Sequence, residues 1–438
     1  MKLPETGRDG EEVLAEMEAR REDDADWQSG RTWSLVYHVD EPHKQFKDDA
    51  HALYSTQNAL SPSAFPSLVG FENEVVGMLA DWLGGDEGTV GNMSSGGTES
   101  ILLAVKTARD WARAERGIDR PHVVLPETAH PAFSKGAHYF GLEETRVPCG
   151  KDWRADPEAM AEAVREETAL VVASAPSYPH GVVDPVEEVA AVAREAGAMC
   201  HVDACIGGIM LASLRDLGRD VPPFDLSVEG VTSLSVDPHK YGYTAKGASA
   251  LLWADADHRE HQYFAFDGWP GGVYAGPTMA GTRPGGPIAA AWGVMQKLGY
   301  EGYLDLAATT METTEALLDG VAEIDGLGVV AEPDMTIFAV ESTDPDLDAY
   351  RVHAEMTERE WGLGRQQRPE SIHASVMYHH RDCVEDFLAD LRESVAVARE
   401  ADGGDDRAPM YGMNAEMAED GDYANLAKTM LNDAVYRP

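Results

Sequence analysis

The stretch VTSLSVDPHKYGY (231–243) decides how this sequence is expected to fold. It begins with an apolar, β-branched run and ends on the polar residues Asp237, His239 and Lys240. Four further apolar runs are separated from it and from one another by segments with helical periodicity. They are HVVLP (122–126), ALVVASAP (169–176), MCHVDAC (199–205) and ASALLW (248–253). This alternation predicts an α/β fold in which helices cover both faces of a mostly parallel sheet.

Three of these runs are followed by chemically suggestive side chains. His130 comes after HVVLP, Asp203 lies within HVDAC, and His239 and Lys240 follow VTSLSVD. Functional residues of open α/β sheets gather at the carboxyl ends of strands, so we expect these side chains to lie together. After about Gly286 the pattern changes to a smaller α+β domain. The expected domains are an N-terminal segment (1–65), a large domain (66–290) and a small C-terminal domain (291–438).

The composition is strongly acidic, with 77 Asp and Glu against 35 Lys and Arg and a net charge of −42. This charge argues against a nucleic-acid partner and favours a halophilic source, with an acidic mesophilic protein as the alternative. The sequence has neither a run of roughly 18 apolar residues nor a signal peptide, so we expect a cytoplasmic protein without a membrane anchor. The spacing of the four cysteines indicates no metal site and no disulfide framework.

The glycine-containing motif SSGGTES (94–100) leads directly into the helical pattern ILLAVKTARDWARA. Backbone N–H groups at Gly97 and Thr98 would therefore lie at a helix N-terminus, which binds anions such as phosphate. The glycines permit close approach of a ligand, and Thr98 adds a hydroxyl. Similar turns also occur without any ligand, so the motif alone leaves both interpretations open.

Lys240 follows an apolar strand, where a lysine can lose its proton and form an imine. The alternative is a surface lysine. Asp203 ends a buried run and needs a cationic partner, either the ring nitrogen of a cofactor or an arginine. His130 has a flat side chain that suits covering a cofactor ring, and His239 suits stacking or hydrogen bonding, although either histidine could be structural.

Five motifs in this order resemble the group II pyridoxal-dependent decarboxylase family: SSGGTES, TAHPAF (128–133), HVDAC, DPHKYGYTAKG (237–247) and YAGPTMAGTRPGG (274–286). Within the family they are most similar to the sphingosine-1-phosphate lyases. The resemblance implies the PLP-dependent transferase fold type I (aspartate aminotransferase-like), with a seven-stranded, mostly parallel sheet in the large domain. It also implies pyridoxal 5′-phosphate as cofactor and a homodimer with shared active sites.

The resemblance also implies roles for individual residues. Lys240 would hold the cofactor as a Schiff base, Asp203 would pair with its ring nitrogen, and His130 would stack on its ring. Thr282 matches a hydroxyl that the neighbouring subunit contributes to the cofactor phosphate. The full set of implied cofactor contacts is Gly97, Thr98, His130, Asp203, His239, Lys240 and Thr282.

Substrate contacts follow from the same resemblance. Tyr178 matches a position near the reacting carbon, and Tyr37 and Lys246 match positions near the substrate's phosphate. Two positions depart from the family: Ser61 replaces a histidine that helps bind phosphate, and Arg368 replaces a residue that is often aromatic. Arg368 thereby offers a new cation to an anionic substrate.

These residues lead to two enzymatic hypotheses. The first is retro-aldol cleavage of a phosphorylated amino alcohol, bound to the cofactor as an external aldimine, with catalysis by Lys240, Tyr178 and His130. The second is decarboxylation of an L-amino acid of the glutamate, aspartate or tyrosine type, which uses the same cofactor chemistry. A cofactor-binding protein without turnover is a third alternative, against which the intact Lys240 and Asp203 argue.

Overall fold

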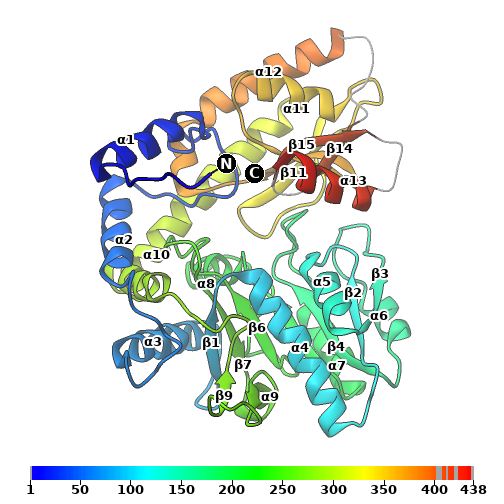
Figure 1. Cartoon of the computed structure of the whole chain (residues 1–438). Helices are drawn as coiled ribbons and strands as arrows, with labels where there is room; N and C mark the ends of the chain where they lie inside the picture. Colours follow the sequence, from blue (N-terminus) through cyan, green and yellow to red (C-terminus); the bar gives the residue numbers. More distant parts are fainter. Residues whose placement is uncertain (1, 401–406, 411–412, 419–422, 436–438) are drawn as a thin grey trace.

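The computed structural model describes residues 2–400, 407–410, 413–418 and 423–435 (Figure 1). Its main feature is a seven-stranded sheet in the order β1-β7-β6-β5-β4-β2-β3. These strands are β1 (Val90–Ser94), β2 (His122–Pro126), β3 (Glu143–Val147), β4 (Thr168–Ser174), β5 (Met199–Asp203), β6 (Ser233–Val236) and β7 (Ser249–Trp253). Strand β7 runs antiparallel to both neighbours, and the other adjacent pairs are parallel. The predicted α/β fold with a mostly parallel sheet is confirmed.

Helices cover both faces of this sheet, which explains why its strands read as continuous apolar runs. In β2, Val123 and Leu125 belong to one hydrophobic cluster, and Val124 between them belongs to another. The first cluster includes residues of α4 (Gly97–Glu115) and α5 (Ala132–Phe140). The second includes residues of α3 (Pro66–Trp82), α6 (Pro157–Ala163), α7 (Val186–Glu195) and α8 (Gly208–Asp216).

Helix α10 (Gly285–Ala322) links the sheet to a smaller α+β unit (Figure 1). Gly299, with φ 61° and ψ 178°, interrupts it. The helical pattern of residues 288–298 ends at this glycine, and the helix resumes beyond it. The smaller unit contains a four-stranded antiparallel sheet in the order β10-β11-β13-β12. Its elements are β10 (Leu327–Val329), β11 (Ile337–Ser342), α11 (Ala349–Glu358), β12 (Gly364–Gln367), β13 (Glu370–Ser375) and α12 (Val384–Glu400).

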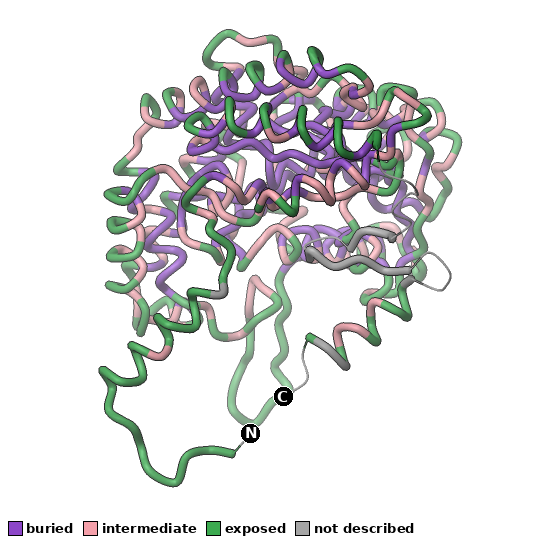
Figure 2. Tube along the Cα trace, turned by 90° about the horizontal axis from the view of Figure 1, so that it is seen from above, coloured by how far each residue is buried: buried purple, intermediate pink, exposed green. Residues whose placement is uncertain are grey.

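The remaining elements lie around these two units. They are α1 (Gly10–Arg20), η1 (Arg21–Asp23), α2 (Glu41–Leu53), α9 (Ala256–Glu260), β8 (Phe264–Phe266), β9 (Tyr274–Gly276), η2 (Tyr378–Asp382), β14 (Arg407–Met410), β15 (Met413–Ala418), α13 (Tyr423–Met430) and η3 (Leu431–Val435). Helix α1 buries none of its residues, and the N-terminal arm is exposed in Figure 2. Within the described ranges, no helix is both long and apolar enough to cross a membrane.

Candidate active site

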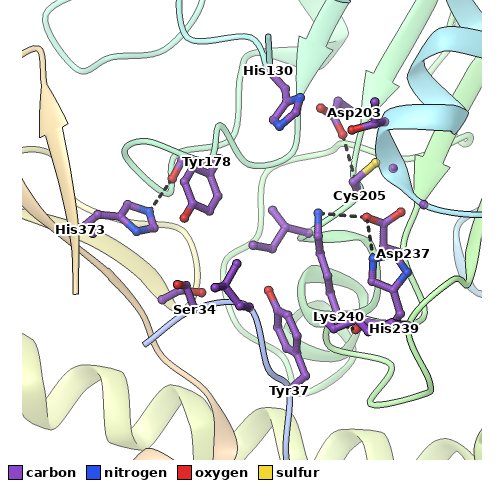
Figure 3. A pocket seen from close by; sticks show the side chains of 18 of the residues that line it. Ser34, Tyr37, His130, Tyr178, Asp203, Cys205, Asp237, His239, Lys240 and His373 are labelled. Atoms are coloured by element: carbon purple, nitrogen blue, oxygen red, sulfur yellow. Dashed lines mark hydrogen bonds and ion pairs between the residues drawn. The ribbon is translucent and has the colours of Figure 1, made fainter. Parts of the chain in front are cut away.

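A cavity of about 1050 Å³ opens where β4, β5 and β6 end (Figure 3). Ser174, Asp203 and Asp237 line it from these strand ends, and α4 contributes its first turn. The segment 34–37 and residues 361–366 of the smaller unit complete the wall. Nine of the predicted site residues line this cavity: Tyr37, Gly97, Thr98, His130, Tyr178, Asp203, His239, Lys240 and Lys246.

Lys240 lies just past β6, and its Nζ is 2.9 Å from Oδ2 of Asp237. The Asp237 side chain is only 1% exposed. Burial by itself lowers the pKa of Lys240, but nearby groups, foremost Asp237, outweigh it and raise the pKa well above its usual value. This differs from the expectation of a lysine that can lose its proton, because the apolar strand before Lys240 does not indicate that the carboxylate of Asp237 contacts the amine. Asp237 itself was not predicted as a site residue.

The first turn of α4 meets the cavity through Gly97 and Thr98. A Cβ atom at Gly97 would lie 2.7 Å from Oδ2 of Asp237 and 2.8 Å from Sγ of Cys205, so only glycine fits there. The carboxylate of Glu99 accepts hydrogen bonds from Ser95 N (2.7 Å), Ser95 Oγ (2.6 Å) and Met279 N (2.8 Å). This carboxylate therefore joins the glycine-containing turn to the segment that precedes α10.

Asp203 is the last residue of β5, and its side chain reaches the cavity. Its Oδ1 accepts hydrogen bonds from Cys205 N at 3.1 Å and from Ser235 Oγ at 3.5 Å. Among the residues that the structure describes, no arginine or lysine forms an ion pair with it. Figure 3 shows His130 on the same side of the cavity, with Nδ1 accepting a hydrogen bond from Ala132 N at 3.1 Å. Burial lowers the pKa of His130, which favours a neutral ring.

Tyr178 stacks on His373, with ring centroids 4.3 Å apart. The ring of His373 also lines the cavity, and its Nε2 lies 2.9 Å from the Tyr178 carbonyl oxygen. His373 was not among the predicted site residues. Its position depends on how the smaller unit packs against the sheet, for which the local pattern contains no signal.

Lys246 and Tyr37 meet at the cavity wall, with the Lys246 Nζ 4.9 Å from the centroid of the Tyr37 ring. Lys246 Nζ also donates to the His239 carbonyl at 3.4 Å. Although Lys246 is exposed overall, protein atoms around its ammonium group, and next the charge of Lys240, lower its pKa to about 8. A cation is therefore present beside the cavity at neutral pH.

Three predicted residues lie outside the lining of this cavity: Ser61, Thr282 and Arg368. Thr282 and Arg368 are exposed. The cation that lines the cavity from the smaller unit is Arg365, which was not predicted. Its Nε donates to Nδ1 of His353 at 3.0 Å, and its Nη2 donates to the Tyr350 carbonyl at 3.2 Å.

Next to Thr282, Arg283 forms a bidentate ion pair with Glu72, at 2.9 Å from Nη1 to Oε2 and 2.6 Å from Nη2 to Oε1. The two side chains are 12% and 10% exposed. Arg283 also donates its backbone N–H to Oδ1 of Asn58 at 3.1 Å. The contact with Asn58 joins the segment before α10 to the loop that contains Ser61. The ion pair with Glu72 joins the same segment to α3.

Comparison with known proteins identifies related chains. Residues 45–341 match the family described as the pyridoxal-dependent decarboxylase conserved domain. Sphingosine-1-phosphate lyase of Arabidopsis thaliana is 44% identical over 422 residues, covering 94% of this chain and 77% of the relative. A probable L-aspartate decarboxylase of Pyrococcus abyssi is 30% identical, covering 90% of this chain and 99% of the relative. The solved sphingosine-1-phosphate lyase of Burkholderia pseudomallei is 40% identical with a TM-score of 0.88, covering 91% of this chain and 93% of that one.

The cavity fits the cofactor of this family. A largely buried carboxylate without a described cationic partner suits a protonated ring nitrogen, and the first turn of α4, a helix N-terminus of the kind that binds phosphate, lines the same cavity. Lys240 brings an amine to the same cavity. The chain therefore belongs to the pyridoxal-dependent decarboxylase family, and pyridoxal 5′-phosphate is its cofactor.

Proposed function

We propose that this enzyme is a carbon–carbon lyase that cleaves a phosphorylated amino alcohol into an aldehyde and a phosphorylated amine. The main support is the 44% identity to a sphingosine-1-phosphate lyase over 94% of this chain. The cation Lys246, beside Tyr37 at the cavity wall, provides a partner for the phosphate. Charge-assisted hydrogen bonds from a lysine suit such a group.

Five residues would hold the cofactor in a reactive state. Pyridoxal 5′-phosphate supplies an electron sink for the pair left when a bond at the amine-bearing carbon breaks. Lys240 would bind it through Nζ, and Asp203 would keep its ring nitrogen protonated, which strengthens that sink. Neutral His130 would cover the ring, and Gly97 and Thr98 would bind its phosphate.

Cleavage also requires that the substrate's hydroxyl loses its proton. The hydroxyl oxygen of Tyr178 is the group we assign to this step, since its side chain lines the cavity. In Figure 3 the Tyr178 ring faces Lys240 across the cavity. The stacking on His373 would hold that ring in place.

Amino-acid decarboxylation is the second candidate. Arg365 lines the cavity and offers a partner for a carboxylate side chain, while Ser61 lacks the cationic character of the histidine it replaces. The probable L-aspartate decarboxylase among the relatives is 30% identical. In this case Lys240, Asp203 and His130 would keep the same roles.

The product distinguishes the two reactions. Purified enzyme is incubated at high salt with phosphorylated amino alcohols and, separately, with a panel of amino acids, and aldehyde and carbon dioxide are measured. We expect an aldehyde together with phosphoethanolamine. Carbon dioxide from an amino acid would instead establish decarboxylation, and turnover of neither class would leave a cofactor-binding protein. Lys240→Ala enzyme is the negative control.

We further propose a homodimer in which Thr282 serves the cofactor phosphate of the neighbouring subunit. Thr282 is exposed and lies outside its own cavity, and a nearby patch on the segment 263–279 exposes seven large apolar side chains. They are Tyr263, Phe264, Phe266, Trp269, Val273, Tyr274 and Met279. Such a patch is typical of a protein interface. Ser61 would face the same neighbour, because contacts between Asn58 and Arg283 fix its loop beside Thr282.

Mixing two inactive variants tests this arrangement. Thr282→Glu repels a phosphate, and Lys240→Ala removes the amine, so each homodimer should be inactive. A mixed dimer would contain one site with both an intact Lys240 and an intact Thr282 from the other subunit, and we expect activity to return after subunit exchange. If mixing restores nothing while mixed dimers form, Thr282 does not act across the interface.

The acidic surface leads us to propose a halophilic protein that works in the cytoplasm. The net charge of −42 would be screened in concentrated salt. We expect the melting temperature to rise steadily as potassium chloride is raised from low to molar concentration. A melting temperature independent of salt would contradict the halophilic origin.

A further inference from the structure

Asp237 is a buried carboxylate to which the proposed reaction gives no role. Its side chain is 1% exposed, and it lies below the first turn of α4, where it leaves no space for a side chain at Gly97. Two side-chain nitrogens approach its Oδ2: Nζ of Lys240 at 2.9 Å and Nε2 of His239 at 3.7 Å. Figure 3 shows both contacts.

Of these two partners, only Lys240 can balance the carboxylate's charge at neutral pH. Burial lowers the pKa of His239 to about 4, so its ring is neutral. A fully buried carboxylate without a cation is strongly unfavourable, whereas a paired one is tolerated. Burial by itself raises the pKa of Asp237, but Lys240 and then His239 outweigh it and lower the pKa below its usual value. Asp237 is therefore ionised and depends on the Lys240 ammonium.

Other titratable groups that face this pair do not replace either partner. Apart from His239, they are Tyr37, His130, Asp203, Cys205 and Lys246. Burial raises the pKa of Tyr37 and of Cys205 and lowers that of His130, so these three are neutral at pH 7. Among the described contacts, neither Asp203 nor Lys246 lies within ion-pair distance of Lys240 or Asp237.

We infer that Asp237 is a positioning residue, which holds the Lys240 amine as an ammonium at the cavity wall whenever that amine is not bonded to the cofactor. The two carboxylates of the site then have separate tasks: Asp203 faces the cofactor ring, and Asp237 receives the lysine. Asp237 also determines the proton balance. To condense with a carbonyl group, the Lys240 ammonium would first give one proton to the surrounding water, and the carbonyl oxygen would then leave as water with the two remaining amine protons as the C=N bond forms.

This inference rests on the assignment of Lys240 as the cofactor lysine, and its test does not depend on which reaction follows. The full-length protein freed of cofactor is treated briefly with acetic anhydride at pH 7 to 11. Mass spectrometry then gives the acetylation rate of the Lys240 peptide. For a free lysine side chain, the acetylation rate reaches half of its maximum at a pH of about 10.4, which we call the midpoint. We expect the wild-type midpoint to lie above this value.

Asp237→Asn should lower the Lys240 midpoint by at least about one pH unit, which is a tenfold faster reaction at pH 8.5. Asp225→Asn is the matched control, since Asp225 is also buried but pairs with Arg215 at 2.6 Å. That control should leave the Lys240 midpoint unchanged. An Asp237→Asn midpoint equal to that of the wild type would overturn the inference.

If Asp237→Asn does not fold, the wild-type midpoint decides, because a value at or below that of free lysine contradicts the ion pair. Failure of the proposed reaction gives a different result. It would appear only in the product assay and would leave the acetylation midpoints as stated.

Discussion

The ammonium group of Lys246 provides the sharpest test of substrate recognition. Its pKa is lowered to about 8, so the group loses its proton within an accessible pH range. Only the protonated form attracts a phosphate. Binding of a phosphorylated substrate should therefore weaken as the pH rises through 8, whereas a neutral substrate should be unaffected by this group.

The expected magnitude follows from the titration. With a pKa of about 8, roughly 90% of Lys246 is protonated at pH 7 and roughly 10% at pH 9. The kcat/KM value reports ionisations of the free enzyme, so it should fall about tenfold between these pH values for a phosphorylated amino alcohol. The substrate's own amine also titrates at high pH, and a matched variant is needed to separate its contribution.

Lys246→Arg is that variant, because a guanidinium stays charged throughout this range. We expect the kcat/KM of this variant to lack the decline near pH 8 and to keep only the pH dependence caused by the substrate's own amine. Lys246→Met should raise KM at pH 7 by about 10- to 100-fold, from the loss of about 1.5–3 kcal/mol for a charged hydrogen bond. If the wild type and Lys246→Arg decline together near pH 8, Lys246 does not bind the phosphate.

Three further predictions concern the cofactor and the stability of the site. Lys240→Ala should abolish turnover and the absorption band of lysine-bound cofactor, as checked by spectroscopy after gel filtration, while circular dichroism shows an intact fold. Glu72→Ala leaves the largely buried guanidinium of Arg283 without its carboxylate partner and should lower the free energy of unfolding in urea by about 3–5 kcal/mol; a loss below about 1 kcal/mol would contradict this. Gly97→Ala puts a Cβ atom 2.7 Å from a carboxylate oxygen and should weaken cofactor binding at least tenfold, as measured by fluorescence titration, on the order of 1.4 kcal/mol. Gly96→Ala is its control, since a Cβ there meets nothing closer than 3.6 Å, and equal effects of the two would refute the steric argument.

The main sheet and the centre of the site could be predicted because their signals are local. Each buried strand is a short apolar run, and parallel strands bring their carboxyl ends to one edge. Asp203 at the end of β5 and Lys240 just after β6 therefore line one cavity. The continuation of α10 beyond Gly299 could not be predicted in this way, because the non-helical backbone of this glycine divides the helix, and buried residues on each side of it pack both parts into place.

Contacts between distant parts of the chain explain the residues that were missed. Arg365 and Arg368 lie three positions apart on or beside β12, where successive side chains point to opposite faces. The sequence alone does not show which face meets the sheet domain, and Arg365 is the one that lines the cavity. The contact between Asp237 and Lys240 likewise depends on the tight turn after β6, whose geometry no periodicity describes.

Glu99 would provide a thermodynamic link between cofactor binding and subunit association. Its carboxylate accepts hydrogen bonds from Ser95, in the turn that we propose to bind the cofactor phosphate, and from Met279, in the segment that we propose to reach the neighbouring subunit. Ordering the turn at Ser95 therefore helps to order the segment at Met279. Thermodynamic linkage requires that ordering the segment helps to order the turn by the same free energy. Cofactor loading should tighten subunit association, and dilution of the enzyme should in turn promote loss of its cofactor.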